Sequence, residues 1–156
     1  MLPASASTGP TVGGILALPA AQRCRREVAT GRLSQRVRRA SMLTAPPSSG
    51  ADLHEHLVCL TGGGDPGGGR PEEVTARLAA ASAAALALDA TAYPAVDEWI
   101  RAARRTAIPL LIAADAEALE TLRSEVLDAV LDHQAALLQR EDEVHRFLVR
   151  IVLAGG

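Results

Sequence analysis

The chain has 156 residues and a formal net charge of -2, and 48% of its residues are hydrophobic although it holds a single Trp, Tyr and Phe. This length fits one domain with an aliphatic core and excludes two domains of ordinary size. The charge argues against a protein dedicated to nucleic acid, which needs a concentrated positive surface, and no apolar run reaches the roughly 20 residues of a membrane span. Two cysteines without a zinc-ligand spacing favour the reducing cytoplasm.

The N-terminal part of the chain predicts small elements. Residues 1–10 contain mostly Ser, Ala, Pro and Gly, and we expect a disordered tip. Residues 11–22 have the apolar spacing of a short helix. In residues 26–43, apolar and polar positions alternate on either side of Gly31, which predicts two short strands joined by a turn. Seven arginines between residues 23 and 39 form a basic run that either contacts an acidic partner or forms a solvated face.

The second half of the chain alternates two patterns. Short apolar runs at residues 56–62, 84–90 and 108–114 favour strands, although the second could also end a helix. The intervening segments, 71–83 and 94–106, have helical spacing. Strands that alternate with helices form a parallel sheet covered by helices. The predicted fold class is therefore α/β, with a small, mostly parallel sheet and flanking helices.

In such sheets, small ligands bind at the carboxyl ends of the strands. Thr61, Gly62, Asp89 and Asp115 follow the three apolar runs, and they are our candidate ligand pocket. The glycine-rich segment 61–70 lacks the Lys-Ser/Thr pair of a phosphate-binding loop, so we interpret it as a plain loop.

No other cluster predicts chemistry. His54, His56 and Cys59 lie close in sequence, but Cys59 should point to the opposite side of a strand and no second set of ligands exists. No spacing indicates a catalytic triad. We therefore expect no metal, no cofactor and no enzymatic activity.

A long helix is expected from residue 116 to residue 153, because this stretch has no Pro or Gly. Its first half should pack on the sheet and its second half should project. The charges of its second half suit the flanks of a parallel helix pair, although the helix could also pack within its own chain. The expected dimer face consists of Val130, His133, Leu137, Val144, Phe147 and Ile151.

Taken in order, several segments resemble the N-terminal sensory domain of PucR-type, or purine catabolism regulator-like, bacterial transcriptional regulators. The segment that ends the chain, "VLDAVLDHQAALLQREDEVHRFLVRIVLAGG", is similar to the helix that leads out of that domain. The other segments are residues 10–22, resembling the opening helix, 26–43, resembling paired strands, 56–63, resembling a strand ending in Thr-Gly, and 93–113, resembling a helix and strand.

The resemblance implies a cytoplasmic, ligand-responsive domain that controls transcription through a C-terminal helix-turn-helix domain. It divides the chain into the tip at residues 1–10, a sensory domain at 11–115 and a signalling and dimerisation helix at 116–156. The 156 residues contain no helix-turn-helix, so we expect no direct DNA binding by this chain. The expected partners are a second copy, a small-molecule effector and full-length PucR-like relatives, with no membrane contact.

Part of the chain departs from the family pattern. The loop between Thr44 and Leu57 and the glycine-rich insertion are looser than the family's segments, so no binding residue is carried over. Two other functions stay open. One is a small α/β metabolite- or nucleotide-binding protein or enzyme that uses the strand ends, and the other is a truncated gene product without function.

Overall fold

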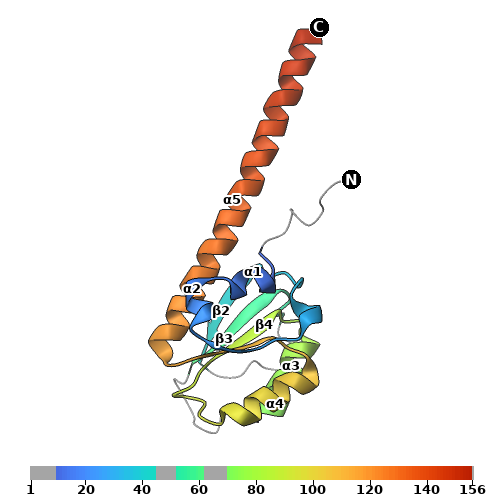
Figure 1. Cartoon of the computed structure of the whole chain (residues 1–156). Coiled ribbons are helices and arrows are strands. Elements are labelled where there is room, and N and C mark those ends of the chain that lie inside the picture. The colour runs from blue at the N-terminus through green and yellow to red at the C-terminus, as the bar shows by residue number, and fades with distance from the viewer. Residues whose placement is uncertain (1–9, 45–51, 62–69, 156) are drawn as a thin grey trace.

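Five strands form one sheet at the centre of the computed structural model, which describes residues 10–44, 52–61 and 70–155 (Figure 1). The order across the sheet is β1-β5-β4-β3-β2; β2 to β5 run parallel, and β1 is antiparallel to β5. This confirms the predicted α/β class with a mostly parallel sheet. The predicted tip, apart from Pro10, and residues 62–69 lie outside the described ranges. The strands are β1 (Arg25–Glu27), β2 (Arg39–Leu43), β3 (His56–Leu60), β4 (Ala85–Asp89) and β5 (Leu110–Ala113).

Helices cover both faces of the sheet. Two of them, α3 and α4, pack on one face, whereas α1, α2 and α5 pack on the other (Figure 1). The predicted N-terminal helix is split in two, because Pro19 starts a new helix after the chain leaves the first. The helices are α1 (Val12–Leu16), α2 (Pro19–Gln22), the 3-10 turn η2 (Thr30–Arg32), α3 (Pro71–Ala80), α4 (Val96–Thr106) and α5 (Ala116–Gly155).

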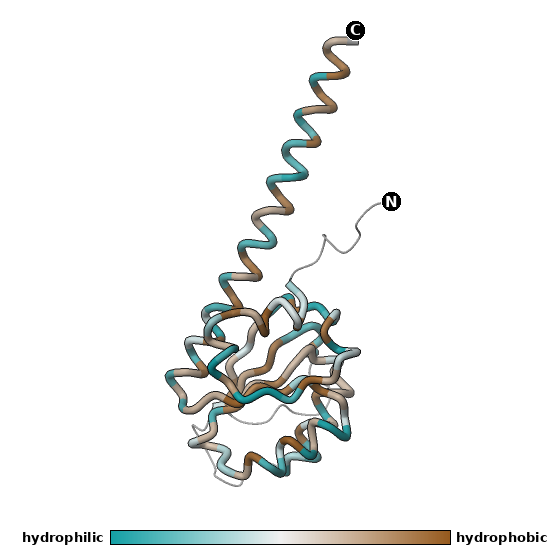
Figure 2. The backbone as a smooth tube through the Cα atoms, viewed as in Figure 1, coloured by the Kyte–Doolittle hydropathy of each residue, from teal (hydrophilic) through white to brown (hydrophobic). Residues whose placement is uncertain are grey.

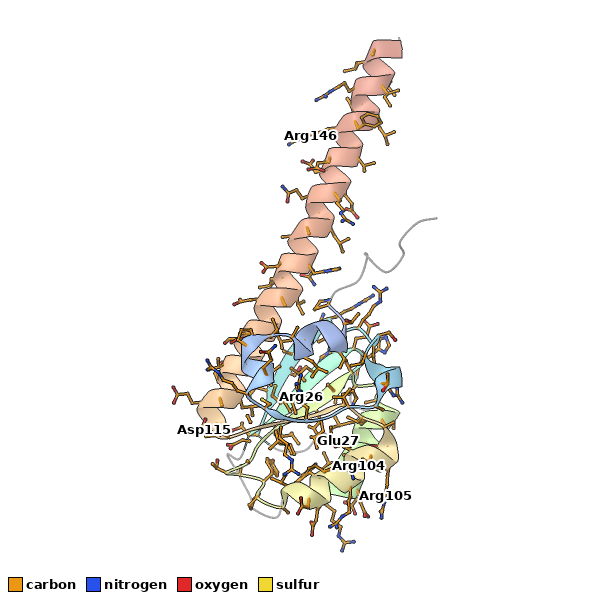
Figure 3. The ribbon with its side chains drawn as sticks, viewed as in Figure 1. Arg26, Glu27, Arg104, Arg105, Asp115 and Arg146 are labelled. Atoms are coloured by element: carbon orange, nitrogen blue, oxygen red, sulfur yellow. The ribbon has the colours of Figure 1, made fainter. Side chains whose placement is uncertain are left out.

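The prediction of two strands joined by a turn at Gly31 is wrong in its pairing. Both strands exist, but β1 lies at one edge of the sheet and β2 at the other. Between them the chain passes through η2 and a bridge between Thr11 and Arg36. Glu27 on β1 instead contacts α4, where Arg104 Nε donates to its carboxylate at 2.6 Å (Figure 3). Alternation reveals strands but does not specify their neighbours, which are chosen by contacts distant in sequence.

The two faces of the sheet differ in side-chain size. On β4, Leu86 and Leu88 point toward α3 and α4, whereas Ala85 and Ala87 point toward α5. Small alanine side chains allow a helix to lie close to the strands, and the leucines of α5 fill the remaining space. The half of the core beside α5 therefore combines small side chains on β4 with large ones on the helix, whereas the half beside α3 and α4 has large side chains on both layers.

The long helix α5 is confirmed, and only its first half packs on the domain. Leu119, Leu122 and Val126 are fully buried, and Val130 is 4% exposed. Beyond Val130 the helix extends away from the domain, and apolar and polar residues alternate along it (Figures 1 and 2). Within the described ranges, no helix combines the length and the apolar content needed to cross a membrane.

Shortening a side chain in the buried half of α5 should destabilise the domain. We expect Leu122→Ala to lower the free energy of unfolding by about 2–5 kcal/mol, because it opens a cavity under a fully buried side chain. The matched control is Leu131→Ala, nine residues along the same helix, where the side chain is 59% exposed and a change within about 0.5 kcal/mol is expected. Urea denaturation followed by circular dichroism measures both; equal losses would contradict this packing.

Candidate functional site

The predicted pocket residues do lie along one edge of the sheet. Leu60 pairs with Leu88 and Asp89 pairs with Ala113, so Thr61, Asp89 and Asp115 all sit at or just beyond the carboxyl ends of neighbouring strands. Gly62 lies outside the described residues. Sharing an edge does not by itself form one pocket, and the surroundings of the two carboxylates differ.

The carboxylate of Asp89 is hydrogen-bonded within the loop that follows β4. Its side chain is nearly buried, at 3% exposure of the residue. One carboxylate oxygen accepts hydrogen bonds from the backbone N–H of Thr91 at 2.9 Å and from its hydroxyl at 2.6 Å. The backbone carbonyl of Asp89 accepts from the N–H groups of Ala92 and Tyr93. Asp89 therefore shapes the turn that leads from β4 toward α4.

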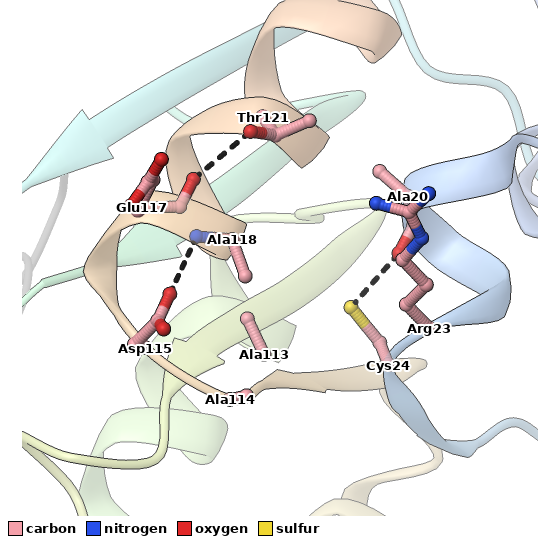
Figure 4. Close-up of a pocket in the computed structure, with 9 residues that line it drawn as sticks. All are labelled: Ala20, Arg23, Cys24, Ala113, Ala114, Asp115, Glu117, Ala118 and Thr121. Carbon is pink, nitrogen blue, oxygen red and sulfur yellow. Dashed lines mark hydrogen bonds between the residues drawn. The ribbon is translucent and has the colours of Figure 1, made fainter.

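Asp115 caps the long helix. Its carboxylate accepts a hydrogen bond from the N–H of Ala118 at 2.7 Å, and its carbonyl accepts from the N–H of Leu119 (Figure 4). This is the geometry of a helix N-cap, which satisfies backbone donors that the first turn leaves without partners. A carboxylate at this end also interacts favourably with the helix dipole.

Asp115 nevertheless lines a cavity of about 320 Å³ at the end of β5 (Figure 4). The cavity lies between the segment joining α2 to β1 and the first two turns of α5. Neither Thr61 nor Asp89 reaches it. Its lining residues are Ala20, Arg23, Cys24, Ala113, Ala114, Asp115, Glu117, Ala118 and Thr121.

The cavity combines apolar walls with a few charges. Four of its nine lining residues are alanines, Arg23 brings a guanidinium group, and Asp115 and Glu117 bring carboxylates. Such a mixture suits a small molecule with an apolar body and polar substituents. The two sides of the cavity are held together by Glu125 on α5, whose carboxylate accepts from the N–H of Ala20 at 3.0 Å.

Both cysteines are buried thiols. Cys24 donates to the carbonyl oxygen of Ala20 at 3.4 Å, and burial raises its pKa above the usual range. Burial raises the pKa of Cys59 more strongly, to about 12. The thiolate is the nucleophilic form, so neither group is poised for covalent chemistry at neutral pH.

The two histidines near β3 contact neighbouring polar side chains. His56 Nδ1 lies 2.8 Å from the hydroxyl oxygen of Ser41 on the neighbouring strand, and burial lowers the pKa of His56. His54 precedes the strand, and its Nε2 lies 3.4 Å from Glu55. Among the described residues, no three His, Cys, Asp or Glu side chains are grouped closely enough to hold a metal ion.

The expected dimer face is only partly available to a partner. Val130 is packed in its own domain, because α5 still covers the sheet there, and this corrects its expected place on that face. His133 and Leu137 are half-buried. Farther along, Val144 is 56% exposed, Phe147 62% and Ile151 51%. Leu137, Val144 and Leu148 line a shallow surface hollow with Arg140, Glu141 and His145.

The sequence revealed one cavity residue, Asp115, and missed most of the others. Arg23 and Cys24 stood out only as part of a basic run and as a lone cysteine. Their place against α5 depends on contacts such as the one between Ala20 and Glu125, which are far apart in the chain. Local periodicity contains no signal for such a contact.

When the chain is compared with protein-family models, curated proteins and solved structures, nothing matches.

The cap at Asp115 can be tested by a pair of substitutions. Asp115→Ala should destabilise the protein by about 0.5–2 kcal/mol, whereas Asp115→Asn should change it little, because Asn caps helices about as well as Asp. Thermal or urea unfolding measures both. A loss in the Asn variant as large as in the Ala variant would mean that the negative charge, rather than the cap, is required.

The buried thiols predict slow modification. At pH 8 a pKa raised by burial keeps both thiols protonated, so we expect Ellman's reagent to react slowly with the native chain and rapidly with both cysteines in denaturant. Absorbance of the released thiolate follows the reaction. Rapid reaction of both cysteines in native buffer would contradict the burial described.

Proposed function

We propose that this chain is the ligand-responsive sensory and dimerisation module of a PucR-like transcriptional regulator of the cytoplasm. The observation that carries the proposal is the second half of α5. It leaves the domain after Val130 and presents Val144 and Leu148 on an exposed face, with the half-buried Leu137 at the end of that face nearer the domain.

An uncovered apolar helix face favours a partner. Burying one Leu, Val or Ile side chain contributes about 1.5–3 kcal/mol, so several of them on a second helix provide a substantial driving force. An isolated helix in water is also marginal at this length, because most helical stability comes from packing. A second copy of the chain brings the same apolar face. Pairing the two faces would bury the apolar side chains and would also stabilise both helices by packing.

The cavity at the end of β5 supports the sensory part of the proposal. Glu117, Ala118 and Thr121, which line it, belong to the first two turns of α5. A ligand there contacts α2 and the start of α5 together. If the ligand binds more tightly to one placement of the helix than to another, it shifts the population of the two, and the projecting half moves with the first half as one rigid element.

The family resemblance supplies the regulatory part of the proposal. The segments that resemble the family coincide with α1 and α2, with β3, with α4 and β5, and with α5. The pairing of β1 and β2 expected from the resemblance is absent. The proposal therefore depends on the long helix that directly follows the last strand, and not on every segment.

The cavity also favours a second candidate, a small metabolite-binding protein without a regulatory partner. Binding of a metabolite by a monomeric chain would distinguish this candidate from the sensory and dimerisation module. Alkylation of Cys24, which lines the cavity, offers a readout: a bound metabolite should slow its modification while leaving that of Cys59 unchanged. Protection of Cys24 in a chain that stays monomeric would favour this candidate.

Charged residues on the exposed face should separate the copies. We expect the double substitution Leu137→Glu and Val144→Glu to change the molar mass from that of a dimer to that of a monomer. In the contact between the two helices, here called the seam, each new carboxylate would lose its water, and the cost of this desolvation opposes dimerisation. The domain should stay folded, because Leu137 is only half-buried and Val144 is 56% exposed. Size-exclusion chromatography with light scattering measures the mass.

The matched control adds the same two charges to the opposite face of the helix. Ala135→Glu with Gln139→Glu alters two exposed positions away from the seam, and it should leave the dimer intact. Dissociation by both double variants would attribute the effect to net charge. An unchanged mass in the Leu137 and Val144 variant would contradict dimerisation through this face.

A further inference from the structure

The cavity at the end of β5 has charges of opposite sign on its two sides. Arg23, at the C-terminal end of α2, brings a guanidinium group to one side, and Asp115 and Glu117, where α5 begins, bring carboxylates to the other (Figure 4). Ala113 and Ala118 lie between the two sides. The cavity is therefore charged at two ends and apolar in between.

Two of these charged groups have no ionic partner within the protein. Among the residues that the structure describes, neither Arg23 nor Glu117 forms an ion pair, either with each other or with a third residue. The same kinds of side chain do pair farther along α5, where Arg123 donates to the carboxylate of Glu120. Arg23 and Glu117 thus line one cavity and leave their charges available to a ligand.

The other polar side chains of the cavity decide which contacts remain open. Asp115 uses one carboxylate oxygen for the helix cap, and its second oxygen accepts no hydrogen bond from the described residues. The hydroxyl of Thr121 donates to the carbonyl oxygen of Glu117, and the thiol of Cys24 donates to a carbonyl oxygen of α2. The open side-chain groups on the α5 side are therefore acceptors, whereas the open donor is the guanidinium of Arg23.

This distribution of charge disfavours two simple classes of ligand. One positive and two negative side chains line the cavity. A ligand with only an anionic group is attracted by Arg23 but repelled by Asp115 and Glu117, and a ligand with only a cationic group meets the reverse. A ligand that carries both groups is attracted to both sides of the cavity.

We propose that the cavity binds a small zwitterion, such as a free amino acid. The carboxylate of the ligand contacts Arg23, its ammonium group contacts Asp115 and Glu117, and its carbon atoms lie on the alanines. The volume of about 320 Å³ is near the lower end of the range for small-molecule sites, about 300–1,000 Å³, which suits a ligand of this size. The inference rests on the proposed sensory function and names the ligand class of its cavity.

A charged ligand also gains more at this site than a neutral ligand of the same shape. Hydrogen bonds between ionised groups are stronger than those between neutral ones, and a guanidinium group can bind a carboxylate through two parallel N–H···O bonds. Because the Arg23 and Glu117 side chains are exposed, water weakens each contact. Binding should therefore be measured with the ligand at millimolar concentration and at low ionic strength.

Isothermal titration calorimetry of the full chain tests the ligand class. The zwitterionic probes are L-alanine, L-valine, L-leucine, 3-aminopropanoate, 4-aminobutanoate and 5-aminopentanoate, which place the two charges at different separations. Butanoate, butylamine and butanamide are the matched probes that carry only the anion, only the cation or neither charge. At least one zwitterion should bind, and each matched probe should bind about tenfold more weakly or worse, because it lacks a charge-assisted hydrogen bond.

A pair of arginine variants tests the site itself. Arg23→Gln keeps a long polar side chain but removes the charge, so it should weaken binding of the zwitterion about tenfold or more. Arg25→Gln is the matched control, because Arg25 is also exposed, lies two residues farther along and does not line the cavity, and it should leave binding unchanged. Circular dichroism checks that both variants keep the fold.

The outcomes keep this inference separate from the proposed function. Absence of binding by every zwitterion, or equal binding of butanoate, butylamine or butanamide, would overturn the inference. An equal loss in Arg23→Gln and Arg25→Gln would overturn it as well. If a singly charged or neutral probe slows alkylation of Cys24 while no zwitterion does, the sensory cavity stands and only the ligand class is wrong. Dimerisation is decided separately, by the molar mass of the chain.

Discussion

The packing of the first half of α5 on the alanine-lined face of the sheet is the contact on which the rest of the structure depends. Ala85 and Ala87 on β4 leave room for Leu119, Leu122 and Val126, and these leucine and valine side chains fill it. This packing fixes the direction in which α5 leaves the domain. It also determines which face of the projecting half is turned toward the domain and which is turned away.

The cavity and the projecting half of α5 are both placed by this packing. Asp115 caps α5 directly after β5, and the next two turns form one wall of the cavity. A ligand held between α2 and those turns is therefore separated from the projecting half by a single continuous helix. Under the proposed sensory function, a change at the cap would reach the projecting half along this one helix, without a chain of intermediate contacts.

The sequence predicted the elements better than their arrangement. Apolar runs and helix-start residues located β3, β4, β5, α3 and α4, and the lack of Pro and Gly predicted α5, because these signals are local. Neither the separation of β1 from β2 nor the cavity residues Arg23 and Cys24 could be predicted, because they depend on contacts across the sheet. Val130 was misplaced for the same reason, since periodicity does not show where the domain ends.

We propose that the exposed face of α5 joins two copies of this chain. Sedimentation equilibrium of the unmodified protein over a wide concentration range tests it most directly. The proposed dimer should have a mass of twice the 16.2 kDa of one chain, with dissociation only on dilution. A mass of one chain at every concentration would contradict it.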